Sequence, residues 1–384
     1  MSASVHGRVE PQFAPVADAF VENFTRHGDL GAAVCVYRYG QPVVDLWAGL
    51  ADPEQGRPWS EDTAVLVFST TKGITAACVN LLIERGQLEL DAPIARYWPE
   101  FAAQGKGAIP LRWALCHKAG LAAVDGELTL AEVLAWDPVV AAIAAQAPNW
   151  EPGTAHGYHA RSYGWILGEV VRRVTGASAG RFLATEFAAP LGLDLWIGLP
   201  AAEEGRVARM HPPEPNPDPA VQAAIEAFMG PTTLLGRVLS GPSGLFGYND
   251  MWNRPELHAA EMPSSNGIGT ARSLARFYAA IIGEVDGHRL LSPATVAAAC
   301  EVQADGPDKV LGVPTRFGLG FALPPMLGGG VGEHAFGHPG AGGSLGFADP
   351  DTGLAFGYVM NQMKLGVTGD ERTAGLIKAL YEAL

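Results

Sequence analysis

The stretch Phe68–Gly86, FSTTKGITAACVNLLIERG, predicts a helix whose first turn carries both a serine and a lysine. Its apolar residues recur at helical spacing and a glycine stands where a C-terminal cap belongs, so a helix of about four turns begins near Ser69. Ser69 and Lys72 are three positions apart and therefore share one face of the helix. This pair is the S-x-x-K pattern, in which a lysine amine takes the proton of a nucleophilic serine.

The start of a helix favours the chemistry that such a pair needs. Free backbone N–H groups and the positive end of the helix dipole stabilise negative charge that develops beside Ser69. Desolvation in a closed cleft would lower the pKa of Lys72 from its free value of about 10.4 towards neutrality. On these two residues alone, a serine that caps a helix and a solvated lysine are the simpler interpretation. Other stretches of the chain change that balance.

Two further stretches supply candidate partners for this pair. Asn149–Trp165, NWEPGTAHGYHARSYGW, places Tyr158 after a Pro-Gly turn and just before a helix, where its phenol can point into a cleft. Phe336–Phe347, FGHPGAGGSLGF, is a glycine-rich approach to a strand, which lets a backbone N–H lie close to a substrate.

Together, these motifs resemble the serine β-lactamase and penicillin-binding superfamily, most closely the class C β-lactamases and the family VIII carboxylesterases. The resemblance covers nearly the whole chain and includes the phrases LCHKAGL at Leu115–Leu121 and EMPSSNGIGTARSLARFY at Glu261–Tyr278. It implies a two-lobed α/β (α+β) fold of the β-lactamase/transpeptidase type, in which helices flank an antiparallel sheet and a helical lobe is inserted. It also implies a serine hydrolase that works without a cofactor or a metal ion.

The resemblance assigns catalytic roles position by position. Ser69 matches the nucleophile, Lys72 its partner base, and Tyr158 the tyrosine of the family's Y-x-N element. The oxyanion hole would consist of the backbone N–H groups of Ser69 and Ala341. Whether Lys72 or Tyr158 is the resting base depends on pKa values that burial sets, so both stay open.

Two departures from the family pattern concern substrate binding. Ala160 stands where the lactamases carry an asparagine, which removes an amide able to hold an amide substrate. His338-Pro339-Gly340 falls on the K-T-G element, and His338 is mostly neutral near pH 7, where a lysine would attract a carboxylate. Together with Gly340, these positions predict hydrolysis of uncharged, short-chain acyl esters through an acyl-enzyme. A β-lactamase or D-Ala-D-Ala peptidase, an acyltransferase and a penicillin sensor without turnover remain alternatives.

Hydrophobic periodicity predicts helices and strands at both ends of the chain and helices in its middle. We expect residues 1–65 and 270–384 to form an α/β lobe and residues 66–269 an inserted, mainly helical lobe, with the active site in the cleft between them. The expected helices are Val16–His27, Leu130–Ala145, Tyr163–Val174, Ala271–Ile282 and Thr373–Leu384. The expected strands are Gly31–Tyr37, Val43–Gly49, Gly318–Leu323, Gly343–Ala348 and Leu354–Asn361.

Other residues match catalytic motifs but lack the required setting. The pattern G-x-S-x-G surrounds Ser178 and Ser344, but a nucleophile elbow needs a strand before the serine and a helix after it. Ser178 is expected to follow a helix, and Ser344 to lead into a strand. His334 and His338 lie four positions apart, yet the glycine and proline around His338 disfavour the helix that zinc would need at this spacing.

The composition fits a globular protein that binds small molecules. The chain has 384 residues, of which 48% are hydrophobic and 17% charged, enough for a large core. A formal net charge of -14 opposes binding to nucleic acid or to an anionic membrane. The four cysteines are expected to be reduced core thiols, and the N-terminal stretch resembles no signal peptide, so we expect a cytoplasmic location. The sequence does not predict the oligomeric state.

Overall fold

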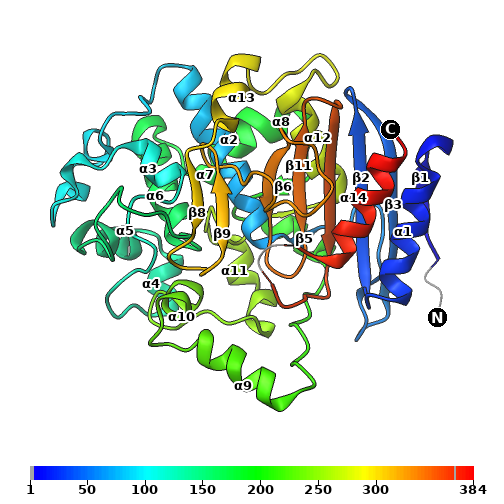
Figure 1. Ribbon diagram of the computed structural model, residues 1–384, viewed down its shortest axis with the longest axis horizontal. Helices are drawn as coiled ribbons and strands as arrows, with labels where there is room; N and C mark the ends of the chain where they lie inside the picture. The colour runs from blue at the N-terminus through cyan, green and yellow to red at the C-terminus, as the bar shows by residue number, and fades with distance from the viewer. Residues whose placement is uncertain (1–3, 367–368) are drawn as a thin grey trace.

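The computed structural model describes residues 4–366 and 369–384, and an antiparallel sheet forms one side of it (Figure 1). The strands lie in the order β1-β3-β2-β12-β11-β10, with β4 paired to β3. Their bounds are β1 His6–Val9, β2 Gly31–Arg38, β3 Gln41–Asp52, β4 Arg57–Pro58, β10 Phe336–Pro339, β11 Leu345–Asp349 and β12 Leu354–Met360. The pairing of β2 with β12 joins the two ends of the chain in one sheet.

Helices cover this sheet because its central strands are apolar on both faces. Every residue of β12 is buried, and α12 (Ala271–Ile282) packs against β2, β11 and β12. Gly357 of β12 permits this close contact, since a Cβ there would lie 2.4 Å from the carbonyl oxygen of Ala271. α1 (Ala14–Thr25) and α14 (Glu371–Glu382) pack on each other, and Figure 1 shows them side by side next to the strands.

The middle of the chain is mainly helical. Its helices are α2 Thr71–Glu84, α3 Leu111–Leu115, α4 Leu130–Leu134, α5 Asp137–Ala145, α6 Ser162–Thr175, α7 Ala179–Leu183, α8 Ala189–Leu191, α9 Pro219–Phe228, α10 Leu234–Ser240 and α11 Pro255–Ala259, and α13 Pro293–Cys300 follows α12. Short strands add two small sheets, formed by β5 Val65–Leu66, β7 Ile268–Gly269 and β6 Leu195–Trp196, and by β8 Ala304–Pro307 and β9 Pro314–Phe317. The division of the chain into an α/β lobe and an inserted helical lobe, at residues 65 and 270, stays a prediction. Residues 1–3 and 367–368, which belong to the expected α/β lobe, lie outside the described residues.

Most of the expected elements are confirmed, and two are wrong. Within Leu130–Ala145 the chain forms α4 and α5 instead of one helix, because Trp136 between them has a φ of 70°. Gly318–Leu323 is not a strand, since Gly320 has a φ of 89° and Ala322 makes only isolated bridges in the described structure. Both errors arise at residues with left-handed backbone, which hydrophobic periodicity does not reveal.

The cysteines contribute to packing and form no cross-links. Cys35, Cys78 and Cys116 are buried, Cys300 is half-buried, and all four are free. Burial raises the pKa of each thiol, which keeps it protonated and unreactive at neutral pH. Within the part of the chain that the structure describes, no helix is both long and apolar enough to cross a membrane.

The buried side chain of Arg372 connects the C-terminal helix both to Asp29 and to the glycine-rich turn after β10. Arg372, near the start of α14, is 1% exposed, and its Nη1 donates to Asp29 Oδ1 at 2.7 Å and to the carbonyl oxygen of Gln362 at 2.8 Å. Its Nε donates to Asp370 Oδ1 at 2.9 Å, and Nη2 donates to the carbonyl oxygen of Gly342. The last bond anchors the turn that follows β10 to the core of the protein.

Arg372→Met should lower the free energy of unfolding by about 3 to 5 kcal/mol, because it leaves Asp29 buried without its counter-charge. Urea denaturation followed by circular dichroism measures this loss. Arg26→Met is the matched control, since Arg26 and Glu22 form an exposed pair of a kind worth about 0 to 1 kcal/mol. Equal losses for the two variants would show that the buried pair does not hold α14 in place.

Candidate active site

Ser69 lies in a strained turn at the start of α2. Residues 68–70 form a 3-10 turn, and Phe68 has a φ of 45°, a left-handed conformation that costs a bulky residue about 1 to 3 kcal/mol. The hydroxyl of Thr71 stabilises the turn, because it donates to the carbonyl oxygen of Phe68 at 2.5 Å and accepts from the N–H of Gly267 at 2.9 Å. The expected helix start near Ser69 is confirmed, and the turn places Ser69 in the wall of a pocket.

Lys72 lies three residues further along, and its amine contacts three oxygen atoms. Nζ is 3.0 Å from Ser69 Oγ, 2.7 Å from the carbonyl oxygen of Ala160 and 3.0 Å from that of Ser264. Burial, together with the charge of Arg161, holds the pKa of Lys72 well below its usual value. The two carbonyls can accept both hydrogens of a neutral amine, which leaves its lone pair directed at the Ser69 hydroxyl.

Tyr158 lies beside this amine, in the loop before α6. The centroid of its ring is 4.7 Å from Lys72 Nζ and 6.1 Å from the ring of His338. Its backbone N–H donates to the buried carboxylate of Asp308 at 3.1 Å, which holds the loop in place. Burial raises the pKa of Tyr158, and the neighbouring Ser69 hydroxyl opposes part of that shift. The phenol therefore carries its proton at neutral pH.

Ser69 and Ala341 both line the pocket, as an oxyanion hole requires. Among the residues that the structure describes, neither backbone N–H donates a hydrogen bond, so both are available to a substrate oxygen. The turn that carries Ala341 needs Gly340, because a Cβ there would lie 2.3 Å from the carbonyl oxygen of Val67. Ser344 closes the turn, since its Oγ donates to that same carbonyl at 2.8 Å and its carbonyl accepts from the N–H of Gly340 at 2.7 Å.

The two positions that depart from the family pattern have different surroundings. Ala160 lines the pocket, whereas His338 is buried against the ring of Tyr158 with its Nδ1 2.7 Å from the carbonyl oxygen of Pro339. Burial and the charge of Lys72 lower the pKa of His338 to about 3. The imidazole is therefore neutral near pH 7, and it offers no counter-charge to a carboxylate.

The other residues that match catalytic or metal-binding motifs lie outside the pocket at Ser69. Ser178 caps α7 and donates to Glu261 Oε1 at 2.5 Å, and Ser344 leads into β11, so neither serine stands on a strand-to-helix elbow. His334 is exposed and lies 2.7 Å from an aspartate oxygen, whereas His338 is buried in strand β10. Within residues 4–366 and 369–384, no group of three or more histidine, cysteine or acidic side chains could hold a metal ion.

Several residues of the pocket lie outside the catalytic motifs of the sequence. Besides the residues described above, its lining consists of Phe68, Arg161, Leu239, Tyr248 and Ser265. Tyr248 packs edge-on against Phe68, with 5.8 Å between the ring centroids. Arg161 directly follows Ala160 in the chain, but no linear pattern reports that an arginine is buried beside Ser69.

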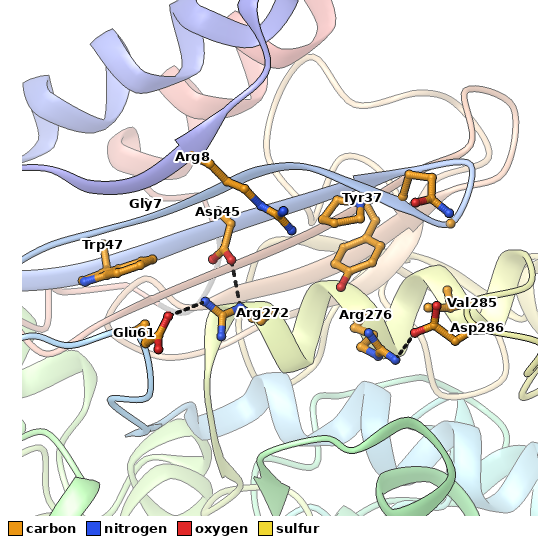
Figure 2. Close-up of a pocket in the computed structure, with 13 residues that line it drawn as sticks. Gly7, Arg8, Tyr37, Asp45, Trp47, Glu61, Arg272, Arg276, Val285 and Asp286 are labelled. Carbon is orange, nitrogen blue, oxygen red and sulfur yellow. Dashed lines mark hydrogen bonds and ion pairs between the residues drawn. The ribbon is translucent and has the colours of Figure 1, made fainter.

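A wider cavity, of about 540 Å³, lies between β1, β3 and α12 (Figure 2). Figure 2 shows two of its arginines paired with carboxylates, Arg272 with Asp45 and Arg276 with Asp286. The cavity shares no lining residue with the pocket at Ser69. Because its ion pairs already neutralise these two arginines, we assign it no part in the reaction.

Comparison with known proteins identifies the family. The model of a family described as Beta-lactamase matches residues 16–380. The chain is 38% identical over 373 residues to the esterase/beta-lactamase LipL of Mycobacterium tuberculosis, which covers 94% of this chain and 83% of that protein. The crystal structure of a family VIII carboxylesterase matches with a TM-score of 0.90 and 38% identity, over 99% of this chain and 100% of the other. A penicillin-binding protein homolog from Caulobacter crescentus matches with a TM-score of 0.89 and 37% identity, over the same shares. The chain therefore belongs to the beta-lactamase family and has its fold of helices and an antiparallel sheet.

Proposed function

We propose that this protein is a serine esterase that hydrolyses short-chain acyl esters through an acyl-enzyme on Ser69. The buried amine of Lys72 carries the proposal, because it lies 3.0 Å from Ser69 Oγ while two backbone carbonyls occupy its other contacts. An amine held in this way can take the serine proton as a general base. The names of LipL and of the family VIII carboxylesterase support an ester as the substrate.

In the first half of the reaction, the acyl group moves to the enzyme. Ser69 Oγ attacks the ester carbonyl carbon as its proton passes to Lys72, and the carbonyl oxygen becomes negatively charged. The N–H groups of Ser69 and Ala341 donate to that oxygen. The bond to the alcohol oxygen then breaks, Tyr158 donates its proton to the leaving alcohol, and the Lys72 ammonium returns a proton to Tyr158.

In the second half, water releases the acid. A water molecule attacks the acyl carbon, and its proton passes to Lys72. The same two N–H groups stabilise the second tetrahedral intermediate. Its collapse breaks the bond to Ser69 Oγ, which regains a proton from Lys72. The cycle therefore uses only residues of this chain, the ester and water.

The pocket favours a small ester over a β-lactam. Ala160 offers no side-chain amide to hold an amide substrate, and the neutral His338 offers no charge. Phe68, Leu239 and Tyr248 give the pocket apolar walls, which suit a short acyl chain. A β-lactamase is the second candidate, because LipL is named an esterase/beta-lactamase and a further relative a penicillin-binding protein homolog. The cytoplasmic location stays a prediction.

Ser69→Ala should abolish labelling by a fluorophosphonate probe, because the variant lacks the attacking oxygen. In-gel fluorescence of the purified protein measures the label. Ser178→Ala, which changes the serine of a G-x-S-x-G sequence, is the matched control and should keep it. Persistent labelling of Ser69→Ala, or its loss in Ser178→Ala, would move the nucleophile away from Ser69.

Lys72→Ala and Tyr158→Phe should each lower kcat by about 100 to 10,000-fold, the range for general acid-base catalysis, and change KM far less. Both side chains move protons in the proposed reaction and need not bind the ester. Steady-state hydrolysis of p-nitrophenyl butyrate separates the two constants. A rise in KM with kcat unchanged would mean that these residues only bind substrate.

For p-nitrophenyl butyrate, kcat/KM should exceed the value for nitrocefin by about 2 to 10-fold, the cost of one missing hydrogen bond. Ala160 cannot supply the asparagine amide that would hold the amide of nitrocefin, and a small ester does not need it. Ala160→Asn returns the amide and should narrow the gap. Comparable efficiency on the two substrates in the unmodified protein would make the β-lactamase the better assignment.

A further inference from the structure

Arg161 is a buried cation in the wall of the active-site pocket. It stands at the start of α6 and is 6% exposed. Its Nη2 donates to the carbonyl oxygen of Leu239 at 2.5 Å, and the guanidinium lies 4.3 Å from the ring centroid of Phe246 and 5.3 Å from that of Trp252. These contacts hold the group between an aromatic face and the pocket.

This guanidinium lacks the partners that a buried charge normally has. No carboxylate of the described residues pairs with it, and Nε is buried without a hydrogen-bond acceptor among them. Other buried cations of the chain are satisfied: Arg372 pairs with Asp29, and Lys106 donates to three backbone carbonyls. Because an unpaired buried charge is costly, the vacant donors of Arg161 point to a missing anion.

The place of Arg161 identifies that anion. The residue lines the pocket together with Ser69, Tyr158 and Ala341, where the scissile ester must lie. We infer that Arg161 binds a carboxylate of the substrate, so that the pocket selects short-chain esters that carry an anionic group. This inference rests on the proposed esterase function and replaces the expectation of an uncharged ester, which considered His338 alone. A planar guanidinium with vacant N–H donors matches a carboxylate in both shape and charge.

Arg161 also acts on its neighbours through its field. It lowers the pKa of Lys72 and opposes the upward shift of Tyr158. This electrostatic effect changes the proton-transfer step that all esters share, so it affects every ester alike. Recognition of a carboxylate instead changes the ratio of kcat/KM between an anionic ester and its neutral counterpart. The effect on the shared step cancels in that ratio.

Two matched pairs of esters test the inference. Methyl hydrogen glutarate against methyl pentanoate places the carboxylate on the acyl side, and O-butyrylglycolate against ethyl butyrate places it on the alcohol side. A pH-stat follows hydrolysis of all four. We expect the anionic ester to be preferred in at least one pair. Arg161→Met should lower that preference by about 10 to 150-fold, as for one charge-assisted contact, and Arg161→Lys should retain part of it.

Lys106→Met is the matched control, because it removes another buried cation that does not line this pocket. It should leave the ratio unchanged. A ratio near one in the unmodified protein, or the same ratio in Arg161→Met, overturns the inference and leaves the esterase standing. If Arg161→Met lowers kcat/KM equally for both esters of each pair and shifts the pH profile, Arg161 acts only through its electrostatic field. That result also overturns the inference.

If none of the four esters is hydrolysed, the proposed esterase function is contradicted. Calorimetry then still tests whether Arg161 binds a carboxylate. Glutarate is titrated into Ser69→Ala and into Ser69→Ala/Arg161→Met. Binding that weakens by about 10 to 150-fold without Arg161 supports a carboxylate site independently of turnover. Equal affinity for the two variants, or no binding to either, overturns it.

Discussion

The proposed active site depends on keeping one amine out of water without placing a carboxylate beside it. Lys72 meets this constraint with oxygens from three segments of the chain, Ser69 Oγ and the carbonyls of Ala160 and Ser264. Each of these groups is uncharged, so they satisfy the amine without stabilising its ammonium form as a carboxylate would. Burial can then depress the pKa of Lys72. An ion pair at any of these contacts would raise that pKa and remove the base.

The two carbonyls are positioned as a unit. The Ser264 hydroxyl donates to the carbonyl oxygen of Arg161 at 2.8 Å, which ties the loop before β7 to the segment that carries Ala160. Gly164 lets α6 approach this loop, because a Cβ there would lie 2.6 Å from the backbone nitrogen of Ser264. The strained Phe68 is held from the same side, since Thr71 accepts from the N–H of Gly267. The geometry around Lys72 thus comes from loops that pack against one another.

A feature could be predicted from the sequence when the residues that form it are close together in the chain. Ser69 and Lys72 share one helix turn, so their spacing alone predicts their approach, and the resemblance adds Tyr158 and the turn that carries Ala341. The carbonyl of Ser264 lies 192 positions from Lys72, and a backbone carbonyl has no side chain to recognise. The burial of Arg161 could not be predicted either, because it depends on contacts with aromatic residues far along the chain. Two-residue strands such as β5 are too short for any period.

Charge acts with opposite sign at the surface and in the pocket. The net charge of -14 repels an anionic ester at long range, but salt screens exposed charges beyond about 8 Å at physiological ionic strength. Arg161 is buried, so salt screens its charge little, and that charge acts on whatever enters the pocket. A carboxylate beside Lys72 would raise the pKa of its amine and favour the ammonium form, which cannot act as the proposed base. Arg161 can pair with a substrate anion without this effect. The guanidinium, which stays charged at neutral pH, is the group suited to that contact.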